Sequence, residues 1–379
     1  MKIIPLAMAR PGMKLAQDLY LNEDDTTPYL RRGFALTEEA IDRLAQQGVL
    51  RIYVAEEIEV PRPAASSPFY LLQNARHAVD PPPPVVKPQL RKDALESLDH
   101  VFNDVLISDA GIVGAERELQ RVADVVDQLV LAVRANRSTL LSIQDLKSYD
   151  EYTYHHSLSV AVLSIALGQA LDIPYRDLLR LGQSAILHDI GKAAVPAELI
   201  QKPARLAEAE FEQVKSHARA GSAFIIDSAA GDEEQWQAVL FHHEKVDGTG
   251  YPTGIAGERI PIWSRIISVA DVFDALTSAR PYRNPVQPAD ALEYIMGGIG
   301  THFDYDVVCA LAKKAALYPV GSLLELSNGQ YGLVLNCENP LRPVVEILDS
   351  GDVVDLAIDR QYFCVVVRRM IPAGQLAAM

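Results

Sequence analysis

Apolar side chains recur at intervals of three and four residues through most of the middle of the chain. The runs HHSLSVAVLSIALGQAL (155–171) and EFEQVKSHARAGSAFIID (210–227) are two examples. This spacing places apolar residues on one face of a helix, which can bury that face against its neighbours. The pattern predicts a mainly α domain over residues 91–318.

Shorter runs with a different spacing flank that block. Residues 1–60 combine the strand-like run RIYVAEEIEV (51–60) with TEEAIDRLAQQG (37–48), which has a capping threonine, early acids and a final glycine. After residue 318, short alternating runs such as QYGLVLNC (330–337) are separated by turn residues. We therefore expect a small α+β module over residues 1–60 and a small β module over residues 319–379.

Proline-rich sequence separates the first module from the helical block. The segments PRPAASSPFY (61–70) and DPPPPVVKP (80–88) carry the prolines. Proline fixes φ and removes a backbone donor, which favours an extended, semi-rigid connector. Residues 61–90 are predicted to be this linker.

Composition and charge narrow the class of protein. The chain has 379 residues, 49% of them hydrophobic, enough for two or three domains of about 150 residues each. Its net charge of −15 argues against a wide basic surface, so we expect no nucleic acid polymer as a partner. We expect neither membrane insertion nor export, because no run approaches the ~18 apolar residues of a membrane helix and Pro5 breaks the N-terminal run. Three scattered cysteines, Cys309, Cys337 and Cys364, favour a reducing cytoplasmic location.

Histidines gather in the helical block. Six of the nine lie between residues 155 and 243. Imidazole and carboxylate groups bind divalent metals, and their number here exceeds what one ion can use, so two ions are predicted. Taken alone, His217 is more often a packed core histidine. Asp271 is different, because an unpaired carboxylate in the apolar run RIISVADVFDALTS (265–278) is costly without a cation.

Three motifs resemble a known family. In LGQSAILHDIGKAAVP (181–196), an apolar helical run leads into His188 and Asp189 and breaks at Gly191. This motif and its surroundings resemble the HD superfamily of metal-dependent phosphohydrolases. HHEKVDGTGYP (242–252) and IPIWSRIISVADVFDALTSARPYR (260–283) narrow the resemblance to the HD-GYP family. The resemblance spans roughly residues 140–317 and implies an HD-domain helical bundle.

The resemblance also implies a set of metal ligands. Asp189 is expected to bridge two ions. The other ligands form two sets of three, one for each ion: His156, His188 and Asp271, and His217, His242 and His243. Lys192 is expected to bind a phosphate oxygen as a point charge, and Glu244 and Asp247 are expected to orient the histidines. Iron or manganese is the expected metal, although the same donors suit zinc.

In the family, the loop after the paired histidines closes over cyclic di-GMP. Glycine and proline suit a tight turn that approaches a ligand closely. The expected loop contacts are Gly250, Tyr251 and Pro252, and for Tyr251 a packing role is an equal alternative. Arg280 and Arg283 are candidate contacts to phosphate or guanine, with an exposed-surface role equally open for Arg283.

The implied activity is hydrolysis of cyclic di-GMP to pGpG or GMP, with metal-activated water attacking a phosphate whose charge the ions neutralise. Hydrolysis of another nucleotide, such as cyclic GMP-AMP, is an alternative, because HD chemistry needs only a phosphoryl group. A third alternative is a sensing module without turnover, although the full ligand set argues against it. The helices at 91–135 suit either a homodimer or an intramolecular bundle, and the flanking modules suit a signalling partner.

Two adjacent histidines compete for one ligand position. His156 is followed by Ser157, as in the family pattern, and is preceded at four residues by Tyr152 rather than by a carboxylate. Some members of the family hold a third ion with a carboxylate four residues before the first ligand histidine. In the alternative register, Glu151 lies four residues before His155 on the same face of the helix and would supply that carboxylate. We prefer His156, which predicts two metal ions.

Overall fold

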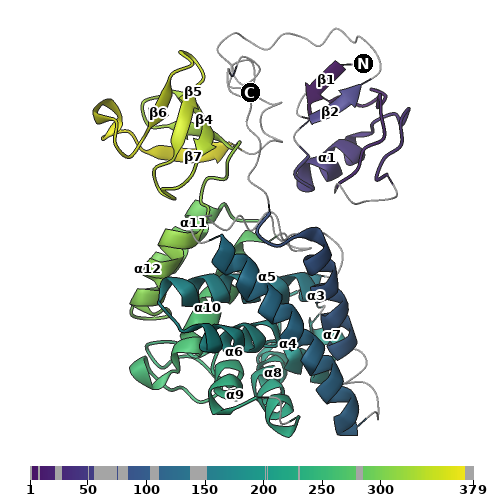
Figure 1. The fold of residues 1–379 in the computed structure, drawn as a ribbon, viewed down its shortest axis with the longest axis vertical. Helices are drawn as coiled ribbons and strands as arrows, with labels where there is room; N and C mark the ends of the chain where they lie inside the picture. Colours follow the sequence, from purple (N-terminus) through teal and green to yellow (C-terminus); the bar gives the residue numbers. More distant parts are fainter. Residues whose placement is uncertain are drawn as a thin grey trace. The chain divides into compact units, whose positions relative to one another are not determined.

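The structure is a computed structural model of the chain. It describes residues 2–6, 9–21, 28–49, 51–54, 75, 84–102, 111–136, 152–200, 202, 204–228, 231–278 and 285–371. The chain divides into two compact units, one formed by residues 83–317 and the other by residues 1–82 together with 318–379 (Figure 1). Among the described residues, none of the helices combines the length and the hydrophobicity needed to cross a membrane.

The unit formed by residues 83–317 is helical, which confirms the predicted mainly α bundle (Figure 1). Its described helices follow in this order: α3 (Pro88–His100), α4 (Gly111–Ala135), α5 (Tyr152–Ala170), α6 (Tyr175–Ile186), the short 3-10 helix η4 (Ile190–Ala194), α7 (Ala197–Ile200), α8 (Glu208–Asp227), α9 (Glu233–Leu240), η5 (Gly257–Arg259), α10 (Ile262–Thr277), α11 (Pro288–Gly297) and α12 (Tyr305–Lys314).

Helix α5 is the central element of this unit. It packs against α3, α4, α6, α10 and α12, and every residue from 155 to 169 is buried. A helix that is apolar on all sides is stable only inside the core, and the run LSVAVLSIAL (158–167) meets that condition. The first turn of α5, which carries His156, is therefore held in the interior.

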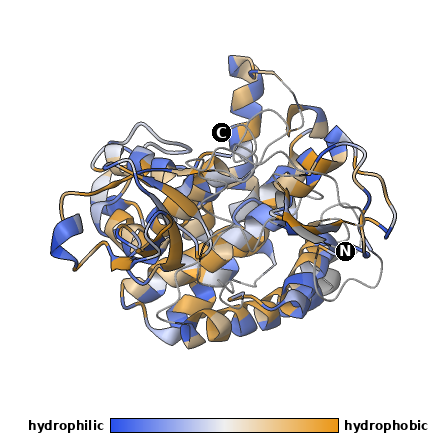
Figure 2. Ribbon diagram, turned by 90° about the horizontal axis from the view of Figure 1, so that it is seen from above, coloured by the Kyte–Doolittle hydropathy of each residue, from blue (hydrophilic) through white to orange (hydrophobic). Residues whose placement is uncertain are grey.

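The surrounding helices interleave hydrophobic and hydrophilic residues, as Figure 2 shows. Their ends follow local capping chemistry. Asp232 accepts a hydrogen bond from the amide of Gln235 at 3.2 Å and begins α9, and Asp304 accepts from the amide of Val307 at 3.1 Å and begins α12. Helix α6 ends at Ile186, so the turn that follows carries the HD motif into the interior.

In the other unit, the N-terminal residues form a small sheet and a helix. Strand β1 (Lys2–Pro5) pairs antiparallel with β2 (Arg51–Val54). Helix α1 (Glu38–Gln46) begins at Thr37, whose side chain accepts a hydrogen bond from the amide of Ala40 at 3.1 Å. Their buried apolar side chains form one cluster: Ile4, Leu6, Met13, Leu15, Leu36, Leu44, Ile52 and Val54. The predicted α+β character of this segment is confirmed.

The C-terminal residues form an antiparallel sheet of five strands in the order β6-β5-β4-β3-β7. The strands are β3 (Leu323–Leu326), β4 (Tyr331–Asn336), β5 (Val344–Ile347), β6 (Val353–Asp355) and β7 (Val367–Ile371), with the 3-10 helix η6 (Arg360–Tyr362) before the last. Cross-strand apolar pairs such as Leu323 with Leu333 bury one face. The predicted C-terminal β module is confirmed.

The predicted linker is described only in part. Helix α3 begins at Pro88, so the last residues of the 61–90 segment are helical instead. Most of the segment lies outside the described residues, and the four-part division of the chain stays a prediction. Helices α3 and α4, which suited either a dimer or a bundle, pack against each other and against α5 of the same chain.

A backbone contact sets the distance between η4 and α8. A β-carbon at Gly191 would lie 2.0 Å from the carbonyl oxygen of His217 and 2.4 Å from the amide nitrogen of Gly221. Any larger residue would have to push two backbones apart. Glycine therefore allows the turn that follows Asp189 to lie directly against α8.

We predict that Gly191→Ala separates η4 from α8. Because the clash is with backbone, the cost should reach or exceed the roughly 1–3 kcal/mol typical of overpacking, and thermal unfolding monitored by circular dichroism should show a lower midpoint. The matched control is Gly297→Ala on α11, where a β-carbon would meet nothing within 4 Å. The control should leave the midpoint unchanged or raise it. Equal midpoints for wild type and Gly191→Ala would contradict the proposed contact.

Candidate metal centre

Histidines and carboxylates from five segments converge inside the helical unit. His156 comes from the first turn of α5, His188 and Asp189 from the turn after α6, and His217 from α8. The turn after α9 adds His242 and His243, and α10 adds Asp271. Five of these side chains are at most 5% exposed: His156, His188, Asp189, His217 and His242. The structure thus brings together the residues that the sequence predicted as metal ligands.

The donor atoms form two groups that share one carboxylate. Within each group, the atoms lie within 4.8 Å of one another. The first group contains Asp189, His217, His242 and His243, and the second contains His156, His188 and Asp189. Asp271 lies beside the second group, with its Oδ1 3.1 Å from Nε2 of His156. Asp189 is the residue that the two groups share.

Backbone carbonyls orient three of the imidazoles. The Nδ1 atoms of His188, His217 and His242 lie 2.8, 2.7 and 2.6 Å from the carbonyl oxygens three residues earlier in the chain. A carbonyl oxygen can only accept, so each Nδ1 carries a proton, and in the neutral ring the lone pair is then on Nε2. The local turn of the chain therefore directs an Nε2 atom into the cluster from three separate segments.

Asp274, which the sequence analysis missed, orients His156. Its Oδ2 lies 2.7 Å from Nδ1 of His156, and its side chain is 1% exposed. Asp271 and Asp274 are three residues apart on α10, so both reach the same imidazole from one face of that helix. The spacing of two acids in VADVFDAL was the available signal, because a second carboxylate in an apolar helix also needs a partner.

Glu244 and Asp247 form hydrogen bonds to the loop that follows the paired histidines. Glu244 Oε1 accepts hydrogen bonds from the amide and hydroxyl of Thr253, both at 2.7 Å, and from the amide of Gly254 at 3.0 Å. Asp247 Oδ1 accepts from the amide and the hydroxyl of Thr249 at 2.9 and 2.7 Å. Through these hydrogen bonds the two acids hold the loop that follows, and their predicted role in orienting the histidines stays a prediction.

That loop, residues 248–254, is called the GYP loop. A β-carbon at Gly250 would lie 2.4 Å from the amide nitrogen of Lys245 and 2.6 Å from the carbonyl oxygen of His243. The Tyr251 amide donates to the same His243 oxygen at 3.2 Å, and the Tyr251–Pro252 peptide bond is cis. The Tyr251 ring lies 4.7 Å from the His243 ring, at 32° between planes. The loop therefore packs directly on a predicted ligand.

Two buried carboxylates remain ionised. Burial raises the pKa of Asp189, but Lys192 and His188 outweigh burial and hold that pKa well below its usual range. Lys192 Nζ forms an ion pair with Asp189 Oδ2, and 29% of the lysine side chain is exposed. Burial also raises the pKa of Asp271, but its contact with His156 brings that pKa far below the usual range. The cluster therefore holds two negative charges.

The imidazoles differ in their protonation. Burial lowers the pKa of His242 well below its usual value and lowers that of His243 to about 3, so both are neutral at pH 7. Burial also lowers the pKa of His156, but hydrogen bonds to Asp271 and Asp274 outweigh burial and raise that pKa to about 10. In the metal-free chain His156 is therefore an imidazolium, and a metal ion must displace its Nε2 proton.

The donor set fits a divalent metal. His188 Nε2 and Asp189 Oδ1 are buried, and neither atom has a hydrogen-bond partner in the described part of the chain. A buried polar atom without a partner is costly, and a cation removes that cost for both. Imidazole and carboxylate are also the donors that divalent first-row metals prefer. The cluster is therefore suited to metal binding.

The remaining predicted residues are placed as follows. His155 turns away from the cluster, with its Nδ1 3.5 Å from Nη2 of Arg91, so His156 is the histidine that joins the other donors. Arg280, Arg283 and Glu151 lie outside the described residues. Their predicted roles therefore stay predictions.

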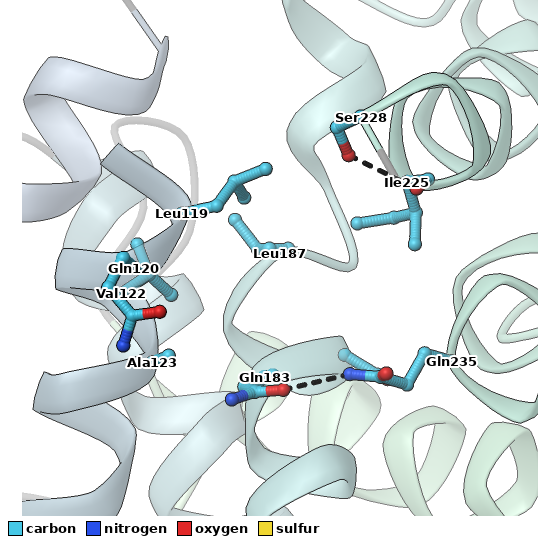
Figure 3. A pocket seen from close by; sticks show the side chains of 10 residues that line it. Leu119, Gln120, Val122, Ala123, Gln183, Leu187, Ile225, Ser228 and Gln235 are labelled. Carbon is cyan, nitrogen blue, oxygen red and sulfur yellow. Dashed lines mark hydrogen bonds between the residues drawn. The ribbon is translucent and has the colours of Figure 1, made fainter. Parts of the chain in front are cut away.

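A separate cavity lies elsewhere in the helical unit. It has a volume of about 430 Å³ and is lined from α4, α6, α8 and α9 (Figure 3). Gln235 Nε2 donates to Gln183 Oε1 across it at 2.9 Å. None of the predicted metal ligands lines this cavity, so it is distinct from the cluster.

The chain is similar in sequence and in fold to known proteins. Residues 139–307 match the HD domain family. Over 357 residues the chain is 34% identical to cyclic di-GMP phosphodiesterase PA4108 of Pseudomonas aeruginosa, which covers 93% of this chain and 86% of that protein. Over 177 residues it is 39% identical to 3'3'-cGAMP-specific phosphodiesterase 3 of Vibrio cholerae, covering 47% of this chain and 38% of that protein. The solved structure of Bd1817, a HDG"Y"P protein from Bdellovibrio bacteriovorus, has a TM-score of 0.50 and 20% identity, and covers 82% of this chain and 97% of that chain.

A helical bundle around a buried histidine and aspartate cluster defines a metal-dependent phosphohydrolase of the HD class. The similarity to the Pseudomonas enzyme extends over nearly the whole chain and includes both flanking segments. The chain belongs to the HD-GYP family of cyclic di-GMP phosphodiesterases, as its motifs predicted.

The raised pKa of His156 gives a prediction for the metal-free chain. Its imidazole should stay protonated at pH 8 and titrate near pH 10, measured by NMR of the histidine ring protons and assigned by the loss of the signal in His156→Gln. Protonation stabilises the fold below the usual histidine pKa of 6.5, and this stabilisation should be lost as the pH rises through about 10.

Asp274→Asn tests the cause of that shift. Removing the carboxylate that accepts from Nδ1 should move the His156 midpoint down toward 6.5. Asp306→Asn, at an exposed acid in the first turn of α12, should leave the midpoint where it is. A wild-type midpoint near 6.5 would show that the two aspartates do not control this histidine.

Proposed function

We propose that this chain hydrolyses cyclic di-GMP to linear pGpG, with GMP as the product of a second hydrolysis. The first step adds one water molecule and breaks one phosphodiester bond of the ring. The observation that carries the proposal is the position of Asp189, shared by two groups of buried donors beside a loop that packs on His243. The similarity to the Pseudomonas cyclic di-GMP phosphodiesterase supports the choice of substrate.

Two divalent ions are proposed for the cluster, held by the seven predicted ligands with Asp189 between them. When bound, such a pair supplies an activated water and neutralises charge on phosphoryl oxygens. Iron or manganese is proposed, and zinc is compatible with the same donors. Two ions are proposed rather than three, because His156 and not His155 faces the other donors.

The protein's own groups prepare the substrate. Lys192 lies at the edge of the cluster with part of its side chain exposed, so its ammonium can reach a phosphate oxygen as well as Asp189. Such a contact stabilises the charge that develops on the phosphate during hydrolysis. The Tyr251 ring covers His243 and keeps water from that side of the cluster. Arg280 and Arg283 are proposed to contact phosphate or guanine.

A second candidate substrate is 3'3'-cyclic GMP-AMP. The observation in its favour is the 39% identity over 177 residues to a Vibrio cholerae phosphodiesterase specific for that molecule. Both substrates present a phosphodiester and purines, so the cluster alone does not separate them. The longer match, over 357 residues, favours cyclic di-GMP.

The metal-loaded chain, purified without oxygen, should convert cyclic di-GMP to pGpG or GMP, as followed by chromatography of the products. Cyclic GMP-AMP at the same concentration should react more slowly. The matched control is the same preparation after treatment with a chelator, which should produce neither product until metal is restored. Binding of cyclic di-GMP to the fully metallated chain without any product would instead favour the sensing alternative.

Paired variants should separate metal binding from phosphate binding. Asp189→Asn should lose metal as well as turnover, because one carboxylate serves both donor groups. Lys192→Met should keep two metals per chain by elemental analysis, since an ammonium is not a ligand, yet lose about 100-fold or more in kcat. Near-normal turnover in Lys192→Met would reassign the lysine to structure. Three metals per chain, with one lost in Glu151→Gln, would overturn the two-metal proposal.

A further inference from the structure

Three side chains form a row along α8 beside the GYP loop. Phe211, Lys215 and Arg219 are spaced four residues apart, so they lie on one side of the helix. The Phe211 ring meets the Tyr251 ring edge-on, with 6.3 Å between centroids. The Lys215 ammonium lies 5.5 Å from the centre of the Tyr251 ring. Arg219 Nη2 donates to the carbonyl oxygen of Pro252 at 2.9 Å.

Tyr251 connects this row to the metal cluster. One side of its ring lies against His243, 4.7 Å away, and His243 is one of the donors grouped around Asp189. Phe211 and Lys215 contact the same tyrosine. Phe211 and Lys215 are therefore separated from a predicted metal ligand by one aromatic ring.

The Phe211 side chain is open to solvent. It is 44% exposed, although the ammonium of Lys215 lies 4.8 Å from its ring centre. Lys215 is held in turn by an ion pair of 2.6 Å with Glu212. Single exposed apolar residues are common on protein surfaces. An exposed ring with a fixed cation, next to a loop that covers a catalytic cluster, instead offers a surface for a flat ligand.

Phe211 and the predicted ligand His217 lie on the same helix, six residues apart, which is a rise of about 9 Å along its axis. When one phosphate of a cyclic dinucleotide lies at the cluster, a base attached to the neighbouring ribose extends away from it. The ring also carries a second phosphate, and this chain has a net charge of −15, so a local cation is needed to attract it.

We propose that Phe211 stacks against a purine base of the bound cyclic dinucleotide and that Lys215 faces the phosphate that is not being cleaved. The inference rests on the proposed function and extends it to a substrate-binding surface outside the metal cluster. Aromatic side chains bind bases in this way through stacking that tolerates any purine. The contact binds the substrate and takes no part in the bond-breaking step.

The test compares Phe211→Ala, Phe211→Leu and Phe211→Trp in the metal-loaded full chain. Two sets of quantities are measured with the native metal: the Kd for a slowly hydrolysed phosphorothioate analogue of cyclic di-GMP, and KM and kcat for cyclic di-GMP. Phe211→Ala and Phe211→Leu should raise both Kd and KM about tenfold, which is the size of a lost base stack. Phe211→Trp should restore both values, because it restores an aromatic face.

Two further variants complete the design. Lys215→Gln should raise KM several-fold and make it less sensitive to salt, since screening acts on the charge that has been removed. Ile226→Ala is the matched control, because Ile226 is an apolar residue of the same helix that is 51% exposed and lies at the far end from Phe211. Metal content should equal that of wild type in every variant.

Each outcome decides something. Unchanged Kd and KM in Phe211→Ala, in a chain that hydrolyses cyclic di-GMP, would overturn the stacking surface and leave the proposed function intact. A Phe211→Leu variant as good as wild type would also overturn it, because it would show that an aromatic face is not needed. Aromatic-dependent binding without hydrolysis would uphold the surface and refute the proposed activity. No binding of cyclic di-GMP to the wild-type chain would refute both.

Discussion

The Asp189 carboxylate is only 1% exposed, and an ionised carboxylate is costly to bury in a protein interior. The arrangement of the helical unit offsets that cost. A lysine and several imidazoles surround the carboxylate and keep it ionised. To supply those partners, α8, the turn after α9 and the first turn of α5 must all approach the turn after α6. The glycine at position 191 permits the closest of these approaches. The packing of these four segments thus surrounds one buried anion.

The fold and the main donors could be predicted because they leave strong local signals. A fully apolar α5, a histidine-aspartate pair at a helix end and two adjacent histidines before a glycine-rich turn are each visible in a short window of sequence. The register of His156 was predicted from the serine that follows it, as in the family pattern, because the apolar spacing of α5 suits either histidine. The α+β and β character of the flanking segments followed from spacing together with capping and turn residues.

Other features depend on contacts between distant segments. Asp274 lies 118 residues from His156, so its role was hidden although the spacing of the two acids was visible. Glu244 follows the paired histidines directly, which suggested that it supports them. Its carboxylate turns forward to the amides of the GYP loop. A sequence shows which groups need partners but not in which direction a short loop turns to supply them.

The spread of the donors along the chain has a consequence for how the protein is made. The first, His156, and the last, Asp271, are separated by most of the helical unit, and α10 is among the last of its helices to leave the ribosome. A chain that ends before α10 therefore lacks Asp271, one of the seven predicted ligands. Because a metal that binds only the folded form stabilises it by mass action, any such contribution to stability is complete only when α10 has packed into the domain.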